Sequence, residues 1–177
     1  MNPARANILG RIRTALQTES APPVAPSASA PFAPVTNPAE TFRAEFLAQR
    51  GEIITDLPAF LAGFPKVASD VDALPGNAGI HEADLGVTGC ECLIAQTGTI
   101  VVSTRAISVL PPVHLVIARP DQLVPDLADA FALLRQRYDG RWPAALSFIT
   151  GPSRTADIEK ILVMGAHGPK RLAIYIQ

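Results

Sequence analysis

The stretch Pro111-Pro112-Val113-His114-Leu115-Val116-Ile117-Ala118 does most to decide the fold of this chain. The residues after the two prolines are rich in β-branched side chains, which favour extended backbone. Polar and apolar residues do not alternate over Leu115-Val116-Ile117-Ala118, as they would in a strand with one face in water. We therefore predict a central strand over 113–118 that is covered on both faces.

Short strands and helices alternate on either side of this stretch. The predicted strands cover 52–55, 66–68, 93–95, 100–103, 146–149 and 172–176, and the predicted helices cover 38–50, 58–64, 125–137 and 156–164. Such alternation is typical of an α/β layer structure with a mostly parallel sheet. Thr97-Gly98 predicts a tight turn between two paired strands, so we expect the sheet to be mixed.

Apolar side chains at helical spacing predict which helix faces are buried. They are Phe42, Phe46 and Leu47 in the helix over 38–50, and Leu127, Phe131 and Leu134 in the helix over 125–137.

The chain divides into three regions. We predict an amphipathic helix within 1–19, a Pro-, Ala- and Ser-rich linker over 20–37, and an α/β domain over 38–177. So short a helix is marginal alone in water, so we expect it to dock on a partner. Its own domain, a second copy of the chain, another protein and a membrane surface all remain open as that partner.

Composition restricts the function classes. The formal net charge is -1 and the cations do not cluster, which argues against nucleic-acid binding. No stretch approaches the roughly 18 uninterrupted apolar residues of a membrane span. Arg5, Arg11 and Arg13 interrupt any secretory signal, and the chain has only 2 cysteines, so we expect a cytoplasmic protein.

The loop Gly151-Pro152-Ser153-Arg154-Thr155 is the first candidate site. It follows the predicted strand 146–149 and precedes the predicted helix 156–164. Unpaired N–H groups at a helix start attract anions, and Arg154 could grip a carboxylate or phosphate with two hydrogen bonds. We predict a small anionic ligand held by Gly151, Ser153, Arg154 and Thr155. Alternatively, these residues form an ordinary turn with helix-capping side chains and bind no ligand.

Two further segments are candidates. His167 lies in Gly165-Ala166-His167-Gly168-Pro169, where it could carry a proton, contact a ligand or simply be solvated. Thr97, Gly98 and Thr99 place a glycine between two hydroxyl groups, which lets backbone amides approach a ligand. A hairpin turn explains them equally well.

Cys90 and Cys92 flank Glu91. On an extended chain both thiols would point to the same side. Their spacing is not that of a zinc or redox pair, so we predict no metal site. Glu91 stands among apolar residues that could raise its pKa, which makes it, with His167, a weak catalytic candidate. The sequence contains no motif for a nicotinamide, flavin or iron–sulfur cofactor, and we predict none.

Several motifs occur together in a fixed order along the chain. They are Gly86-Val87-Thr88-Gly89, Ile94-Ala95-Gln96-Thr97-Gly98-Thr99, Leu110-Pro111-Pro112-Val113-His114, the segment from Ile149 to Glu159, and Gly165-Ala166-His167-Gly168-Pro169. This order resembles the LUD family, and within it the lactate utilisation protein C (LutC/YkgG) branch. Gln96 departs from the family pattern, in which an acidic residue is common at that position.

The resemblance implies a three-layer, Rossmann-like fold similar to NagB/RpiA/CoA-transferase-like proteins, with a mixed sheet and helices on both faces. It also implies a part in oxidising L-lactate to pyruvate beside iron–sulfur partner proteins. Because the chain shows no motif for an electron acceptor, we expect a non-redox component that binds a small anion or those partners. A homo-oligomer would complete a pocket that this short chain lacks.

Two alternatives stay open, so whether the chain is an enzyme is left undecided. One is a free-standing enzyme acting on a CoA ester or a phosphorylated small molecule. The other is a protein-interaction module that uses the N-terminal helix.

Overall fold

The computed structural model describes residues 3–17, 33–74, 76–156, 162–164 and 167–177. It contains two compact units, Met1–Ala33 and Pro34–Gln177. The first holds helix α1 (Pro3–Leu16), within the region 1–19 for which the sequence predicts an amphipathic helix. Ile8, Ile12 and Leu16 of α1 are exposed. The structure leaves residues 18–32 undescribed, so most of the predicted linker lies outside it.

A parallel sheet forms the centre of the second unit. In spatial order its five strands are β1 (Glu52–Ile53), β11 (Arg171–Ile176), β6 (Val113–Ala118), β3 (Leu85–Thr88) and β2 (Val67–Ser69). Neighbouring strands all run parallel. Every residue of β6 is buried, which confirms the prediction of a strand covered on both faces.

A second sheet has four strands and is mixed. Its order is β7 (Leu123–Val124), β4 (Cys92–Ile94), β5 (Thr99–Val102) and β8 (Ser147–Ile149). The predicted turn joins the antiparallel pair β4 and β5 through the 3₁₀ turn η1 (Ala95–Thr97). Gly98 follows with φ +62°, and a Cβ there would collide with the backbone N of Phe46. Glycine is therefore required for this turn to lie against the chain at Phe46.

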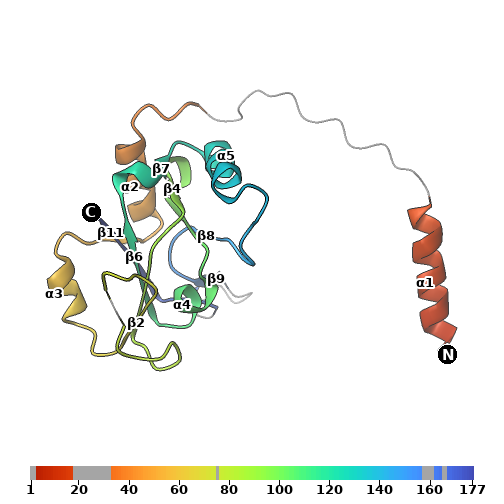
Figure 1. The fold of residues 1–177 in the computed structure, drawn as a ribbon, viewed down its shortest axis with the longest axis horizontal. Coiled ribbons are helices and arrows are strands. Elements are labelled where there is room, and N and C mark those ends of the chain that lie inside the picture. Colours follow the sequence, from red (N-terminus) through yellow and green to blue (C-terminus); the bar gives the residue numbers. More distant parts are fainter. Residues whose placement is uncertain (1–2, 18–32, 75, 157–161, 165–166) are drawn as a thin grey trace. The chain divides into compact units, whose positions relative to one another are not determined.

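Helices cover the two sheets and confirm the α/β class. Side chains of α3 (Leu57–Leu61) pack on one face of the parallel sheet. Phe42 and Phe46 of α2 (Pro38–Ala48) pack between the two sheets. The far face of the second sheet packs on α5 (Leu127–Tyr138), which lies beside β4 and β7 in Figure 1. No helix in the described part of the chain is long and apolar enough to cross a bilayer.

The buried helix faces differ in part from prediction. Phe42 and Phe46 are buried as predicted, but Leu47 is exposed. In α5 the buried residues are Ala130 and Leu134, four positions apart, whereas Leu127 is 48% and Phe131 39% exposed. The small side chain of Ala130 lets α5 approach the sheet, so the larger residues beside it lie at the edge of the contact.

The predicted helix over 156–164 is wrong in its described residues, 156 and 162–164, which lie in strands, whereas 157–161 lie outside the described part of the chain. Strands β9 (Arg154–Ala156) and β10 (Leu162–Met164) occupy its ends and pair antiparallel, with Thr155 opposite Val163. Periodicity alone does not distinguish a helix from strands in so short an apolar segment. Here pairing between the two ends decides the conformation. Sequence reasoning also missed β3, β7 and the short helix α4 (Arg105–Val109), which packs against β3 and β6.

Candidate functional site

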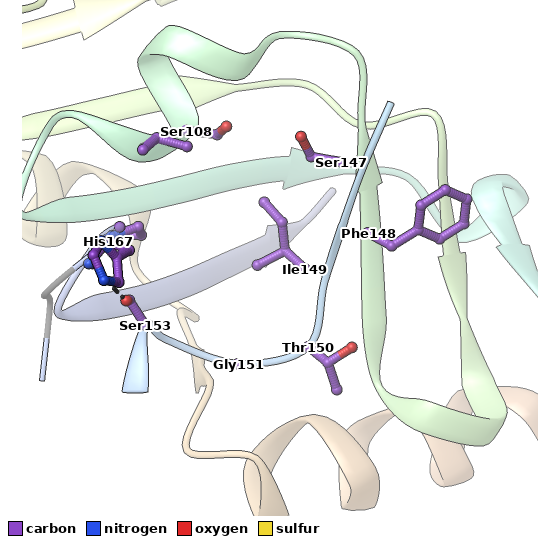
Figure 2. Close-up of a pocket in the computed structure, with 11 residues that line it drawn as sticks. Ser108, Ser147, Phe148, Ile149, Thr150, Gly151, Ser153 and His167 are labelled. Atoms are coloured by element: carbon purple, nitrogen blue, oxygen red, sulfur yellow. Dashed lines mark hydrogen bonds between the residues drawn. The ribbon is translucent and has the colours of Figure 1, made fainter. Parts of the chain in front are cut away.

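A cavity of about 260 Å³ opens beside β8. Three segments line it: residues of α4, the run from β8 into the following loop, and the segment before β11 (Figure 2). The lining residues are Ser108, Val109, Ser147, Phe148, Ile149, Thr150, Gly151, Ser153, His167, Gly168 and Pro169. The carboxyl end of β8 thus leads into the cavity. The central parallel sheet, by contrast, meets it at the amino end of β11, where Gly168 and Pro169 stand.

The loop after β8 and the segment before β11 are tied together at this cavity. The backbone N of Ser153 donates to the carbonyl oxygen of Pro169 at 2.9 Å. The backbone N of His167 donates to the Oγ of Ser153 at 3.3 Å, as Figure 2 shows. The structure therefore brings together three predicted site residues, Gly151, Ser153 and His167.

Gly151 fixes the direction in which the loop leaves β8. Its φ is +85°, in the left-handed region that favours glycine. A Cβ at this position would collide with the carbonyl oxygen of Gln49, just after α2. The loop therefore depends on a residue without a side chain.

Arg154 and Thr155 do not behave as predicted. Both belong to β9, so no helix begins at this loop and a helix dipole cannot hold an anion here. The Nη2 of Arg154 donates to the Oε1 of Gln49 at 2.9 Å, and the exposed Arg154 is absent from the cavity lining. The predicted grip by Arg154 therefore has no support in this geometry.

A chain of threonine hydroxyls lies on the other side of β8. The Oγ1 atoms of Thr97 and Thr99 are 2.7 Å apart, and that of Thr150 lies 2.7 Å from Thr99. We call these residues the threonine chain. Two predicted site residues, Thr97 and Thr99, are thus linked by hydrogen bonds to Thr150, the residue that follows β8. Thr150 was missed, although a hydroxyl residue directly before the glycine was a usable signal.

A second cavity, of about 390 Å³, borders the threonine chain. Its lining consists of Ile94, Thr97, Thr99, Leu127, Phe131, Phe148 and Thr150. Phe148 and Thr150 point to one side of β8 and Ser147 and Ile149 to the other (Figure 2). This is the ordinary alternation of a strand. Strand β8 thus lies between the two cavities, and Phe148 and Thr150 line both of them.

The prediction of a raised pKa for Glu91 is wrong. Burial raises the pKa of its carboxyl group, but hydrogen bonds from Tyr138, Ser103 and Arg137 outweigh burial, and the pKa is lowered. The Nη1 of Arg137 lies 2.6 Å from the Oε2 of Glu91. An ionised, paired carboxylate explains this residue structurally, and Glu91 lines neither cavity beside β8.

The two cysteines occupy different environments. Cys90 packs against the cluster between the sheets, whereas Cys92 belongs to the cluster under α5. The expectation that both thiols face one side is therefore wrong, because Cys90 precedes β4 and does not share its alternation. Burial raises the pKa of Cys90 to about 12 and that of Cys92 to about 11. Such thiols stay protonated and are poor nucleophiles.

The chemistry available around β8 is hydrogen bonding. Hydroxyl groups and one imidazole lie among apolar side chains around the first cavity, and apolar side chains surround most of the second. Among the residues that the structure describes, no three of the His, Cys, Asp and Glu type gather as a metal site would require.

Comparison with known proteins agrees with this fold. The chain is similar to the lactate utilization protein C of Bacillus licheniformis, with 36% identity over 115 residues, which is 59% of this chain and 48% of that protein. It is 35% identical over 107 residues to the protein of the same name from Deinococcus radiodurans, covering 56% of this chain and 49% of the relative. The alignments thus span about half the length of these relatives.

A solved structure and a family model complete the comparison. The fold is similar to a crystal structure of a DUF162 family protein from Deinococcus radiodurans, with a TM-score of 0.59 and 22% identity. The match covers 78% of this chain and 95% of that one. The LUD domain model matches residues 77–176, which include β6, β8, β11 and both cavities beside β8. The chain belongs to the LUD domain family.

Proposed function

We propose that this chain is a binding component of a lactate-utilisation system and holds a small carboxylate, such as lactate or pyruvate, in the cavity beside β8. The name shared by its relatives supports the pathway. The observation that carries the proposal is the meeting of Gly151, Ser153 and His167 at one cavity, although they come from two separate loops.

The size of the cavity suits a small acid. Its volume of about 260 Å³ lies just below the usual range for ligand sites, roughly 300–1,000 Å³. A ligand with few carbon atoms fits such a space better than a nucleotide or a CoA ester does.

The polar groups of the cavity suit a carboxylate. The Oγ of Ser153 accepts the N–H of His167, which leaves its own proton to donate to a ligand oxygen. Ser147 adds a second hydroxyl to the lining, and the imidazole of His167 adds a ring nitrogen. Oxygen atoms of a carboxylate accept such donors, and an α-hydroxyl or α-keto oxygen adds a further contact.

The proposed role is binding, with electron transfer left to partner proteins. Lactate oxidation moves two electrons, and the sequence carries no motif for a group that accepts them. Iron–sulfur proteins, which the family resemblance implies, would take that part. The alignments span about half the length of these relatives, and the proposal concerns only the cavity that this chain itself forms.

A ligand titration tests the binding role. L-lactate and pyruvate are titrated into the full chain, with the unfolding temperature and amide NMR signals as readouts. A ligand that binds only the folded state stabilises it by about 2.7 kcal/mol at 100 times its dissociation constant. We expect Ser153→Ala and His167→Ala to weaken this effect, and Arg154→Ala, whose side chain lies outside the cavity, to retain it.

Two results would count against the proposal. One is stabilisation by neither acid in a well-folded chain. The other is loss of binding in Arg154→Ala while Ser153→Ala still binds the acid, which would place the ligand at Arg154 of β9 and not in the cavity. A separate arm retrieves the tagged chain from cells that grow on lactate, and the retrieved fraction is assayed for iron and acid-labile sulfide, which we expect to co-purify with it.

A further inference from the structure

We infer a second ligand site on the opposite side of β8, which takes a small molecule with a hydrocarbon part and one hydrogen-bond acceptor, such as an aryl or medium-chain carboxylic acid. The site is the cavity of about 390 Å³ lined by α5, the β4–β5 turn and β8. We call it the apolar groove. It lies across β8 from the proposed lactate cavity and shares the lining residues Phe148 and Thr150 with it.

The walls of the apolar groove are exposed hydrocarbon. Leu127 is 48%, Phe131 39% and Phe148 40% exposed. The rings of Phe131 and Phe148 contact each other, with centroids 5.6 Å apart. One ring belongs to α5 and the other to β8, so their contact joins two walls of the groove. Apolar surface that stays in contact with water gains free energy when a hydrocarbon covers it.

The floor of the apolar groove is polar and contains a free hydrogen-bond donor. Three hydroxyl groups joined by two hydrogen bonds use two of their three protons. Thr99, the central member, is only 5% exposed, whereas Thr97 and Thr150 at the two ends are exposed. If the two bonds run in the same direction, an end hydroxyl keeps its proton for an acceptor in the groove, and if both ends donate to Thr99, the hydroxyl of Thr99 keeps it.

These features specify the ligand class. The lining contains no charged side chain, so the groove does not hold a polyanion such as a nucleotide. Its walls contact the hydrocarbon part of a ligand, and the spare hydroxyl proton contacts a carbonyl or carboxylate oxygen. The volume lies within the usual range for small-molecule sites. A flat protein partner would cover the rings without reaching a buried hydroxyl such as that of Thr99.

The test uses two probes that share one hydrocarbon. 3-Phenylpropionate has acceptor oxygens, whereas 3-phenylpropylammonium has only donors. Both are titrated into the full chain while the methyl NMR signals of Ile94 and Leu127 are followed. We expect both signals to shift with 3-phenylpropionate, and the ammonium probe to bind about tenfold more weakly, since one charge-assisted hydrogen bond contributes about that factor.

Three variants separate the walls from the floor. Phe131→Ala removes a wall and should weaken 3-phenylpropionate binding about tenfold. Thr150→Val keeps the shape but removes an end hydroxyl, so it should reduce the preference for 3-phenylpropionate over the ammonium probe. Leu110→Ala is the control, because Leu110 is 51% exposed and lies outside the lining. Circular dichroism verifies that each variant folds.

Three outcomes would overturn the inference. The methyl signals of Ile94 and Leu127 do not move with 3-phenylpropionate; the two probes bind equally; or sedimentation shows a dimer that Phe131→Ala dissociates, which would make the groove an interface between copies. Ser153→Ala distinguishes this site from the proposed lactate cavity, since it should reduce lactate binding and leave 3-phenylpropionate binding unchanged.

Discussion

The Oγ1 of Thr88 lies 2.9 Å from the Nε2 of His114, across the neighbouring strands β3 and β6. His114 is fully buried, and burial lowers the pKa of its imidazole to about 4. Within the described residues, its Nδ1 has no hydrogen-bond partner. A buried, neutral histidine of this kind makes the folded state sensitive to acid.

The first prediction concerns that sensitivity. In the unfolded chain His114 binds a proton below about pH 6.5, whereas in the folded chain it does so only near pH 4. Stability should therefore fall as pH decreases through this window, with His114 contributing about 2 kcal/mol between pH 7 and pH 5. Urea unfolding at both pH values measures it. His114→Gln should lose this part of the pH dependence, and His81→Gln, at an exposed histidine, should retain it. An imidazole of His114 that titrates near pH 6.5 by NMR would contradict the prediction.

The second prediction concerns the thiols. Because burial raises the pKa of Cys90 to about 12 and that of Cys92 to about 11, both remain protonated at pH 8. Iodoacetamide should react far more slowly with the folded chain than with the urea-unfolded chain, as mass spectrometry would show. Cys90→Ser and Cys92→Ser assign the sites. Rapid labelling of either thiol in the folded state would show that it is accessible and ionised.

The third prediction concerns the loop after β8. Gly151→Ala combines an unfavourable positive φ with a collision against Gln49, so it should lower the free energy of unfolding by about 3 kcal/mol. Gly140 provides a matched control, since it has φ +78° but a Cβ added there would meet no atom within 4 Å. Gly140→Ala should lower stability by only about 1 kcal/mol. Equal effects in thermal unfolding would mean that the loop moves away from Gln49 without loss.

The fourth prediction compares two ion pairs. Arg137 contacts both the backbone oxygen and the carboxylate of Glu91, and that carboxylate is only 14% exposed. The pair of Arg171 and Glu52 is much more exposed, at 48% and 39%. Arg137→Met should destabilise the chain by about 2 kcal/mol, and Arg171→Met by under about 1 kcal/mol. Urea unfolding at low and high salt checks this, because only the exposed pair should weaken clearly with salt.

Sequence predicted the fold best where local pattern and tertiary environment agree. The strand Val113–Ala118 is apolar throughout apart from His114 and is buried on both faces. The Thr97-Gly98 turn needs a glycine for its own backbone and for its contact with α2. At such positions the residue type alone indicates the local structure.

Prediction failed where a distant partner decides. Residues 154–156 and 162–164 form strands because they pair with each other, which no local periodicity reveals. Arg154 was expected to bind an anion, but Gln49, far away in the chain, accepts its hydrogen bond. Glu91 was expected to be destabilised as an anion, but Arg137 stabilises it. The convergence of Ser153 and His167 was likewise visible only in three dimensions.

Because β8 lies between two cavities, an inserted residue that changes its register would affect both of them. Its pairing with β5 sets Ile149 opposite Ile100 and Phe148 opposite Val101. A shift of one residue would turn every side chain of the strand to the opposite face. A single residue inserted between Trp142 and Ser147 that shifts this register would leave the backbone of the sheet intact and exchange the side chains that β8 contributes to the two cavities.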